Sequence, residues 1–518
     1  MKIDRRAMLK TVGGACSALA LSRTAMARAA ATGTSFEGTR ASLHAYRTPE
    51  WFRDAKFGIW SHWGPQSAIE AGDWYARNMY QQGSEQYNYH VQTYGHPSKV
   101  GYKDLVNDWK AAKWEPDHLI DLYKKAGAKY FVSMGVHHDN FDLWNSKHNR
   151  WNSVQMGPHK DVVGIWRDAA RKAGLHFGVS EHLWISYKWW ATSHLSDKTG
   201  ALAGVPYDGA DPKFADLYHD ADSGRFGDQL DWNSDGIPDS WRKHYLDRIT
   251  DLIDQHEPDL IYTDGYLPFE DYGLKMVAHL YNVSAARNGG RVEAVYNSKL
   301  DSDCAVGTCT LDHERGVADA ISVNPWQTDT CIGQWHYKRG QKYKTAKKVI
   351  DLMTDIVSKN GNLLLSIPLP NSGEPDWEEL EVLDGITKWM NVNSEGIYGS
   401  RPWKIYGEGP STDVTLIKTG NFNEDKRPDF TVEDVRFTTK GSTLYAFVQG
   451  WPGKEAHGNI HIKALGIDSV LEPGKIQHVT LLGAKGQVKW TQEAASLKVH
   501  LPEEQISSIG ITLKIEFA

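Results

Sequence analysis

The sequence predicts an α/β protein in which a (β/α)8-type, TIM-like barrel is followed by a C-terminal antiparallel β-sandwich. Apolar strands and amphipathic helices alternate between about residues 51 and 400, which indicates the barrel. Polar side chains follow several of these strands, where barrel enzymes carry their chemistry. After about residue 400 the pattern changes to short alternating strands separated by Gly, Pro and Asn turns, which is typical of a sandwich.

The elements of the barrel are predicted from two hydrophobic patterns. Continuous apolar runs indicate buried strands, and apolar residues at helical spacing indicate helices. The expected strands are 57–61, 129–136, 175–180, a strand around Leu260, 292–296 and 362–367. The expected helices are 116–125, 162–173, 240–256, 276–287 and 343–358. Gly174 suits the C-terminal cap of the second helix. Alternation over about 340 residues favours a closed barrel over an open doubly wound sheet.

Two further regions complete the predicted domains. Residues 183–239, inserted in the barrel domain at 51–400, are aromatic, acidic and rich in glycine, without clear periodicity. Such a stretch is typical of an active-site lid or binding loop. The sandwich, 401–518, is expected to act as a structural buttress, with a carbohydrate-binding module as the alternative. Its expected strands are 414–417, 435–438, 443–448, 460–462, 478–482, 497–501 and 511–515.

The N-terminus, residues 1–29, has the pattern of a twin-arginine signal peptide. Arg5 and Arg6 precede a mild apolar run and small-x-small cleavage candidates. We therefore expect a bacterial protein exported to the periplasm or secreted, with 30–50 as a flexible lead-in. No later stretch predicts a membrane span. The sequence has no basic stripe interleaved with aromatic residues, so we do not expect it to bind nucleic acid. The oligomeric state stays open.

Cysteine spacing and one acidic loop raise two further questions. Cys304 and Cys309 are spaced to close a short disulfide loop in an oxidising compartment, while Cys331 is left without a partner. Residues 231–236, Asp-Trp-Asn-Ser-Asp-Gly, begin like a calcium loop. The twelfth position is Arg242 rather than Glu, so a plain Asx-rich turn is the favoured interpretation and calcium the alternative.

Carboxylates at strand ends are the strongest chemical signal. Asp264 follows an apolar strand and precedes a glycine, which is where a barrel enzyme places a nucleophile. Retaining glycoside hydrolysis needs a second carboxylate as acid, roughly 5–5.5 Å away. Glu314 is the best candidate, with Glu270 and Glu293 as rivals. A capping Asp and a surface salt-bridge run are the structural alternatives for Asp264 and Glu314.

Histidines follow three early strands, and their imidazoles suit a polar pocket for sugar hydroxyls. They are His62, His137, His138 and His182. A metal site is the rival interpretation, although adjacent His-His-Asp is poor ligand geometry because neighbouring side chains point apart. Flat aromatic rings near these positions can stack on sugar faces. They include Trp60, Trp63, Trp74, Trp144, Trp184, Trp189, Trp190, Trp326 and Trp335.

Ordered motifs give the chain a resemblance to a known family. They are Lys-Phe-Gly-Ile at 56–59, His-Trp-Gly-Pro at 62–65, Asp-Trp-Tyr at 73–75, His-His-Asp-Asn-Phe at 137–141, Tyr-Thr-Asp-Gly at 262–265, Asp-His-Glu-Arg-Gly at 312–316, Pro-Trp-Gln-Thr-Asp at 325–329 and Val-Ser-Lys-Asn-Gly-Asn-Leu-Leu-Leu at 357–365. Over about residues 45–400 the chain resembles the α-L-fucosidases, family 29 of the glycoside hydrolases.

The resemblance implies a barrel with a β-sandwich and a retaining double displacement on a fucosylated glycan. We expect no cofactor and no metal. Asp264 matches the nucleophile and Glu314, less closely, the acid/base. Matching or candidate residues for the fucose hydroxyls and ring are His62, Trp74, His137, His138, His182, Tyr262 and Trp335. Tyr262 stands where many members have Trp. His182 falls near the position where many members have a Tyr-Tyr-Ser strand end, and Val-Ser-Glu-His at 179–182 departs from that pattern. Alternatives are an exo-glycosidase for another L-sugar such as an α-L-galactoside, a non-catalytic sugar-binding protein, or a metallohydrolase.

Overall fold

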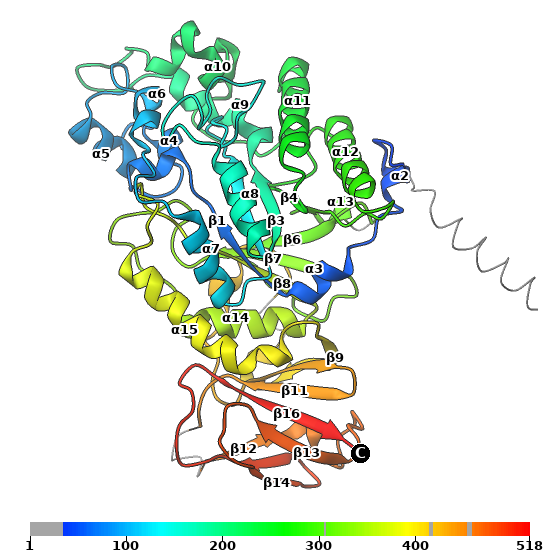
Figure 1. Cartoon of the computed structure of the whole chain (residues 1–518). Coiled ribbons are helices and arrows are strands. Elements are labelled where there is room, and N and C mark those ends of the chain that lie inside the picture. The colour runs from blue at the N-terminus through cyan, green and yellow to red at the C-terminus, as the bar shows by residue number, and fades with distance from the viewer. Residues whose placement is uncertain (1–34, 305–306, 414–417, 453–457) are drawn as a thin grey trace, which may run out of the picture.

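The computed structural model describes residues 35–304, 307–413, 418–452 and 458–518. The expected signal peptide at 1–29 and the expected strand at 414–417 lie outside these ranges. The described chain forms a closed parallel barrel and, beneath it in Figure 1, a domain of two antiparallel sheets. The predicted fold class is therefore confirmed.

Eight parallel strands close the barrel in chain order. They are β1 Phe57–Ser61, β2 Tyr130–Val136, β3 His176–Glu181, β4 Leu260–Thr263, β5 Val295–Ser298, β6 Thr310–Glu314, β7 Trp326–Cys331 and β8 Gly361–Ser366. Pairing of Gly58 with Leu364 joins the last strand to the first. Most of these strands are buried along their length because neighbouring strands and an outer layer of helices cover them.

Strands β6 and β7 are absent from the sequence-based expectation. Their sequences, Thr-Leu-Asp-His-Glu and Trp-Gln-Thr-Asp-Thr-Cys, are polar, so no apolar run marks them. They are held by ladder hydrogen bonds to strands on both sides and by polar partners within the barrel, such as Gln327 Nε2 donating to Asp312 at 2.9 Å. No helix lies between them among the described elements, so the alternation of strand and helix also fails there.

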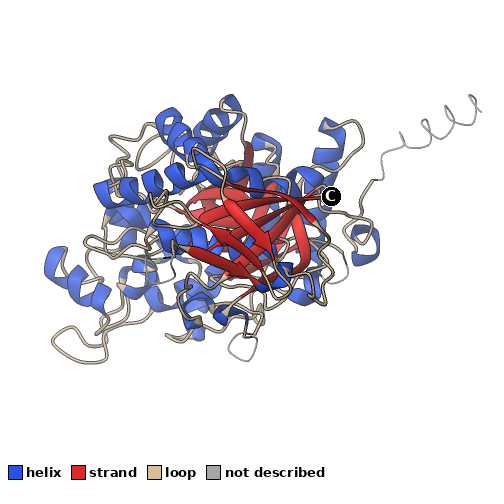
Figure 2. Cartoon of the chain, turned by 90° about the horizontal axis from the view of Figure 1, so that it is seen from below, coloured by secondary structure: helices blue, strands red, loops and turns tan. Residues whose placement is uncertain are grey.

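Helices form the outer layer of the barrel, and in the view from below, where the C-terminal sheets are nearest the viewer, they extend beyond the central strands (Figure 2). Their bounds are α2 Arg40–Leu43, α3 Glu50–Ala55, α4 Tyr75–Asn78, α5 Glu85–Thr93, α6 Tyr102–Leu105, α7 Pro116–Lys125, α8 Val162–Lys172, α9 Ser186–Trp189, α10 Ala215–Tyr218, α11 Asp239–His256, α12 Asp271–Arg287, α13 Asp301–Cys304, α14 Ala346–Ser358 and α15 Trp377–Asn393. Helix α8 starts at the cap Asp161 and stops before Gly174, whose φ is +76°. Helix α15 was not expected, although Asp376 and Glu379 form a capping box at its start. No helix among the described residues has the length and apolar character needed to cross a membrane.

One expectation about the irregular segments changes. The described part of the lead-in, residues 35–50, is docked rather than flexible, because Phe36, Leu43 and Tyr46 are buried and Tyr46 stacks on Tyr281 of α12 at 4.3 Å between ring centroids. The insertion at 183–239 is built from short helical turns with many buried aromatic residues. Aromatic packing rather than helical periodicity holds it, so a periodicity search finds nothing there.

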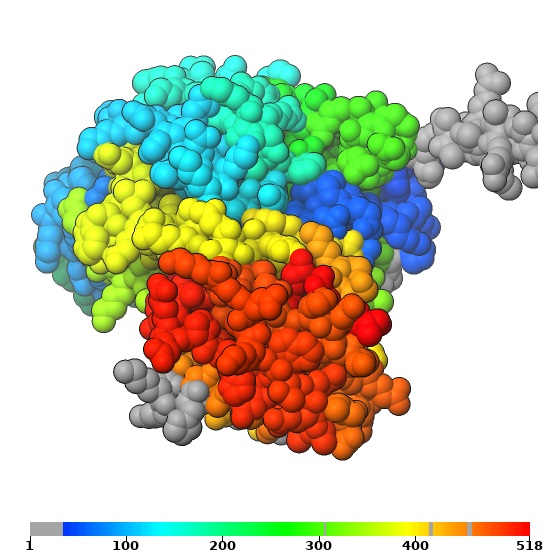
Figure 3. All heavy atoms as spheres, turned by 60° about the horizontal axis from the view of Figure 1, so that its bottom comes forward, coloured from blue at the N-terminus to red at the C-terminus, as the bar shows by residue number. Residues whose placement is uncertain are grey.

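The C-terminal domain consists of two sheets that share one hydrophobic core. The larger has the order β13 Ile476–Leu481, β16 Ile511–Phe517, β11 Thr443–Val448, β10 Val435–Lys440 and β9 Arg401–Glu408, and the smaller has β12 Asn459–Ile462, β15 Leu497–His500 and β14 Lys489–Gln492. Strand β9 was not expected, because Pro402 and Gly407 interrupt its pattern; a Pro is tolerated on an edge strand. The domain lies against α14 and α15 and covers that side of the barrel (Figures 1 and 3).

Candidate active site

Polar side chains converge at the carboxyl ends of the barrel strands, around a cavity of about 600 Å³. The parallel arrangement requires this, because all strands of a parallel barrel end on the same face. Of the residues predicted from sequence, the cavity wall includes His62, Trp74, His137, His182, Asp264, Glu314 and Trp335. The long insertion contributes Trp184 and Trp232 to the same wall, as expected of a binding loop.

Asp264 is fixed by the turn that follows β4. Trp184 Nε1 donates to its backbone carbonyl at 2.7 Å. The next residue, Gly265, has φ +133°, and a Cβ there would come within 2.7 Å of the Trp184 ring nitrogen. Only glycine fits both the backbone conformation and this close approach. The Asp-Gly pair that stands out in the sequence is thus a packing requirement that holds the carboxylate at the cavity.

Lys299, which sequence reasoning missed, joins the two candidate catalytic carboxylates. Its Nζ lies 2.5 Å from Asp264 Oδ1 and 2.5 Å from Glu314 Oε2. Two oxygens that are each 2.5 Å from one nitrogen can be no more than about 5 Å apart. That upper limit is close to the roughly 5–5.5 Å between the carboxyl groups of a retaining glycosidase and lies below the roughly 6.5–9.5 Å of inverting enzymes. Lys299 follows β5, so the strand-end rule contained the signal for it.

The two carboxyl groups have opposite protonation preferences. Burial alone would raise the pKa of Asp264, but the Lys299 ammonium and His182 outweigh it and hold that pKa well below its usual value. Burial raises the pKa of Glu314 to about 7, against the lowering effect of Lys299 and with the help of the Asp264 charge. Each side chain is 18% exposed. At neutral pH the site therefore contains an ionised Asp264 and a substantially protonated Glu314.

Two histidines complete the surroundings of Asp264. His182 Nδ1 lies 3.0 Å from Asp264 Oδ2 and must donate to it, because an ionised carboxylate only accepts. Burial, opposed by Asp264, lowers the pKa of His182. Its buried Nε2 has no partner and in the neutral ring is an acceptor that a hydroxyl can use. His138 Nε2 is 3.4 Å from the same carboxylate oxygen, and its Nδ1 donates to the His182 carbonyl at 2.6 Å.

A second imidazole group lies beside these. Gln66 Nε2 donates to His137 Nδ1 at 2.8 Å, which leaves the His137 Nε2 proton free to donate. His336 Nδ1 lies 2.6 Å from Asp73 Oδ1, and His336 Nε2 and His62 Nδ1 are buried without partners. Burial, reinforced by neighbouring imidazoles, holds the pKa values of His62 and His137 well below 6.5, so both are neutral. His336 was missed because it lies five residues beyond β7, past the strand end.

The same atoms are close enough to hold a metal ion. Ligand atoms of His62, Asp73, His137 and His336 lie within 4.8 Å of one another, as do those of His137, His138 and His182. Elsewhere in the described ranges no comparable group of three or more such residues is found. The geometry of these side chains thus fits either sugar hydroxyl groups or a cation. The ionised Asp264 and protonated Glu314 beside them favour the hydroxyl groups, because retaining glycoside hydrolysis needs that carboxyl pair.

Three of the predicted residues have different surroundings from those expected. Tyr262 is fully buried behind the cavity and donates to Asp329 Oδ2 at 3.1 Å, so it supports the wall without forming it. Glu270 is paired with Arg40 at 2.6 Å on the surface. Glu293 lies 3.4 Å from Arg291, and neither rival of Glu314 lines the cavity. The C-terminal domain adds two unexpected lining residues, Asn421 and Phe422.

Lys188 contacts two of the side chains that would serve as calcium ligands in the acidic loop. Its buried ammonium donates to Asn233 Oδ1 at 2.8 Å and lies 3.5 Å from Asp231 Oδ2. The Asn233 side chain also accepts from the Asp235 amide at 2.9 Å, which is an Asx turn. The Asx-turn interpretation therefore fits the structure better than calcium. Separately, Cys304 and Cys309 are joined by a disulfide, while Cys331 is a buried thiol.

Comparisons with known proteins show the family and the fold of the chain. A family model described as Alpha-L-fucosidase matches residues 23–395, and one described as Alpha-L-fucosidase C-terminal domain matches residues 427–516. The chain is 27% identical to the mouse tissue alpha-L-fucosidase over 467 residues, which cover 87% of each chain. It is 26% identical to the human tissue alpha-L-fucosidase over 483 residues, which cover 90% of this chain and 88% of the human one. The crystal structure of Thermotoga maritima alpha-fucosidase in complex with fucose aligns with a TM-score of 0.68 at 24% identity, covering 92% of this chain and 99% of that chain, which shows the same fold.

Proposed function

The chain belongs to the α-L-fucosidase family and is a glycoside hydrolase, and from this premise we propose that it removes terminal α-L-fucosyl residues by a retaining double displacement. Asp264 is the nucleophile and Glu314 the acid/base. The observation that carries this assignment is the carboxyl pair bridged by Lys299, with its oxygens within about 5 Å and its protonation preferences opposed.

In the first step ionised Asp264 attacks the anomeric carbon, and protonated Glu314 gives its proton to the leaving oxygen. A β-linked fucosyl ester on Asp264 results. Esterification removes the Asp264 charge that helps to raise the pKa of Glu314, so the pKa of Glu314 falls and its carboxylate can accept a proton from water. That water hydrolyses the ester and restores the α configuration.

The imidazole groups give the pocket its preference for hydroxyls. His182 Nε2 offers an acceptor and His137 Nε2 a donor, while His62 Nδ1 and His336 Nε2 are buried and unpartnered. A sugar with a missing or inverted hydroxyl leaves such groups without partners, which costs about 1–3 kcal/mol each. An exo-glycosidase for another L-sugar, such as an α-L-galactoside, is the alternative on the same scaffold.

The substrate is a fucosylated glycan, and we propose that the protein meets it outside the cytoplasm. The twin-arginine pattern at residues 1–29 supports export to the periplasm or medium. The Cys304–Cys309 disulfide is consistent with an oxidising compartment. N-terminal sequencing of the mature protein from a periplasmic fraction tests this, since a start after Ala27 or Ala29 is expected and an intact Met1 would contradict it.

Azide trapping with 4-nitrophenyl α-L-fucoside tests both catalytic roles. Asp264→Gly is expected to lose turnover and to regain it with azide as β-L-fucosyl azide, because one displacement inverts the centre. Glu314→Ala is expected to form α-L-fucosyl azide, because azide then attacks the β-linked ester. An Asp264→Gly enzyme with wild-type activity, or inverted product from Glu314→Ala, would refute the assignment. Hydrolysis of 4-nitrophenyl α-L-galactoside in preference to the fucoside would favour the alternative sugar.

A further inference from the structure

One segment of the C-terminal domain leaves that domain and reaches the active-site cavity. It is residues 418–427 of the connection between β9 and β10, called the strap below. Gly420 forms an antiparallel bridge with Val317 of the barrel, and Thr419 Oγ1 donates to Asp319 at 2.6 Å. The strap thus lies along the chain that follows β6, the strand that ends in Glu314.

The strap binds the backbone of Glu314 itself. The Phe422 amide donates to the Glu314 carbonyl at 2.7 Å, and the Glu314 amide donates to Asn421 Oδ1 at 3.0 Å. The main chain of the proposed acid is thereby held from both sides by two successive residues of the strap. Asn421 and Phe422 also line the cavity together with Glu314, Lys299 and Trp335.

Buried polar contacts anchor the middle of the strap to the barrel. Glu424 accepts from Thr330 Oγ1 of β7 at 2.8 Å and pairs with Lys344 at 2.9 Å. Asn423 donates through Nδ2 to the Val317 carbonyl at 3.1 Å. Because Glu424 and Asn423 are both buried, these contacts are shielded from water and fix the strap relative to the barrel.

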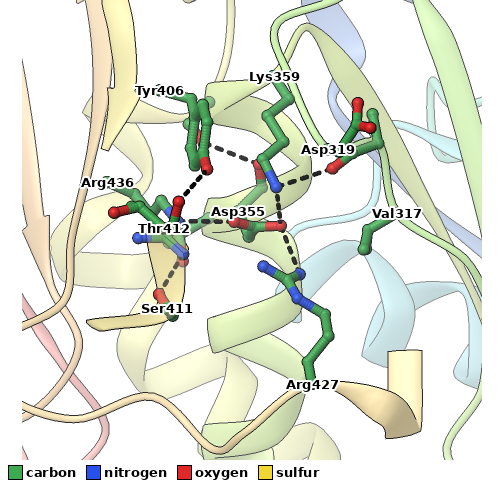
Figure 4. Close-up of polar contacts among 12 residues, drawn as sticks. Val317, Asp319, Asp355, Lys359, Tyr406, Ser411, Thr412, Arg427 and Arg436 are labelled. Carbon is green, nitrogen blue, oxygen red and sulfur yellow. Dashed lines mark hydrogen bonds and ion pairs between the residues drawn. The ribbon is translucent and has the colours of Figure 1, made fainter. Parts of the chain in front are cut away.

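A charge cluster fixes the end of the strap (Figure 4). Asp355 of α14 accepts from Arg427 of the strap at 2.6 Å, from Arg436 of β10 at 2.6 Å and from Lys359 at 2.9 Å. All four side chains are buried. One carboxylate therefore binds the barrel, the strap and the C-terminal sheet together, and removing it would leave several buried cations uncompensated.

Phe422 is held in a conformation that packing does not explain. Its φ is +53°, a region that costs a non-glycine residue about 1–2 kcal/mol, and its side chain is not buried, since the residue is 56% exposed. Strain of this kind persists only where the surroundings impose it, and such residues cluster at active sites and ligand clamps. Here the hydrogen bonds on both sides impose it and hold an open aromatic ring at the mouth of the cavity.

The position of this ring relative to Glu314 identifies what it would contact. The histidine pocket and Asp264 take the fucosyl ring, and Glu314 protonates the oxygen that joins fucose to the rest of the glycan. A ring beside Glu314 and open to solvent then faces the leaving group. Pyranose rings present an apolar C–H face, which packs on flat aromatic surfaces.

We propose that Phe422 is the platform of the leaving-group subsite, where it stacks on the sugar unit bonded to fucose, and that the C-terminal domain is thereby part of the active site. This inference rests on the proposed function. The domain acts as more than a buttress, since its strap both supplies this ring and positions Glu314. The ligand class is a fucosyl oligosaccharide with a pyranose next to the fucose.

The test compares a substrate that has a sugar leaving group with one that has none. The full-length protein and Phe422→Ala are assayed on α-L-fucosyl fluoride and on the disaccharide that wild type cleaves fastest from a panel of fucosyl-galactose and fucosyl-N-acetylglucosamine isomers. We expect kcat/KM of Phe422→Ala to fall about 10- to 100-fold more on the disaccharide than on the fluoride. Phe422→Trp should restore the disaccharide activity, because it replaces the flat ring.

The matched control is Trp377→Ala, which removes an aromatic ring that is 70% exposed but does not line the cavity. Equal losses of Phe422→Ala on both substrates would make the strap purely structural and overturn the inference, as would an undiminished rate on the disaccharide. A wild-type enzyme that cleaves the fluoride but no disaccharide of the panel also overturns it. Inertness of wild type on the fluoride would instead overturn the proposed function.

Discussion

Replacing Lys299 by Gln tests whether the Lys299 ammonium sets the protonation of both catalytic carboxyl groups. Its Nζ lies 2.5 Å from Glu314 Oε2. With about 4 Å between charge centres and an effective dielectric constant of about 20, the attraction is about 4 kcal/mol. At 1.36 kcal/mol per unit this bounds the effect on the pKa of Glu314 at about 3 units.

Water entering the vacated space reduces that figure, so we expect an upward shift of about one to two units. Hydrolysis needs Glu314 protonated and Asp264 ionised. In wild type kcat/KM therefore falls as pH rises through about 7, where Glu314 loses its proton. In Lys299→Gln this alkaline limb moves to higher pH. The acid limb also moves up, because Lys299 holds the pKa of Asp264 down.

The assay is the pH dependence of kcat/KM for 4-nitrophenyl α-L-fucoside, measured for wild type, Lys299→Gln and Lys299→Arg. The arginine variant keeps the positive charge and should keep both limbs near their wild-type positions. An alkaline limb of Lys299→Gln that stays in place or moves to lower pH would refute the electrostatic reasoning. Near-ultraviolet circular dichroism checks that the variants retain native packing.

Three other outcomes follow from the structure. Asp355→Asn should lower the free energy of unfolding by about 3–5 kcal/mol in urea titrations followed by tryptophan fluorescence, because it leaves buried cations unpaired. The control Asp384→Asn, in an exposed pair with Lys388, should cost less than about 1 kcal/mol, and equal effects of the two variants would contradict this. Since the folded pKa of Asp355 is depressed, its contribution to stability is present above pH about 4 and is lost as pH falls through that lower pKa. Dialysis against EDTA should leave hydrolysis of 4-nitrophenyl α-L-fucoside intact, and a loss of rate that zinc restores would assign the histidines to a metal instead. Replacing Cys304 and Cys309 together by Ser should cost about 2 kcal/mol of unfolding free energy, as expected for a short closed loop, and an unchanged urea midpoint would show that the bond does not constrain the unfolded chain.

The sequence by itself determined most barrel strands and the site residues that directly follow them. Apolar runs found β1, β2, β3, β4, β5 and β8, and the strand-end rule placed His62, His137, His182 and Asp264 on one face. These inferences hold because burial imposes a period on the chain and a parallel barrel brings every strand end to one face. The same rule applied to β5 points to Lys299.

Tertiary structure alone decided the contacts between distant segments. The hydrogen bond between Glu314 and Asn421 spans 107 residues, and the one between His336 and Asp73 spans 263. Strands β6 and β7 are polar and became recognisable only through their neighbours in the barrel. Hydrophobic periodicity reports which face of an element is buried, but it carries no record of which distant polar group lies opposite. The bridge of Lys299 between two carboxylates and the reach of the strap into the cavity therefore emerge only when barrel and C-terminal domain are packed together.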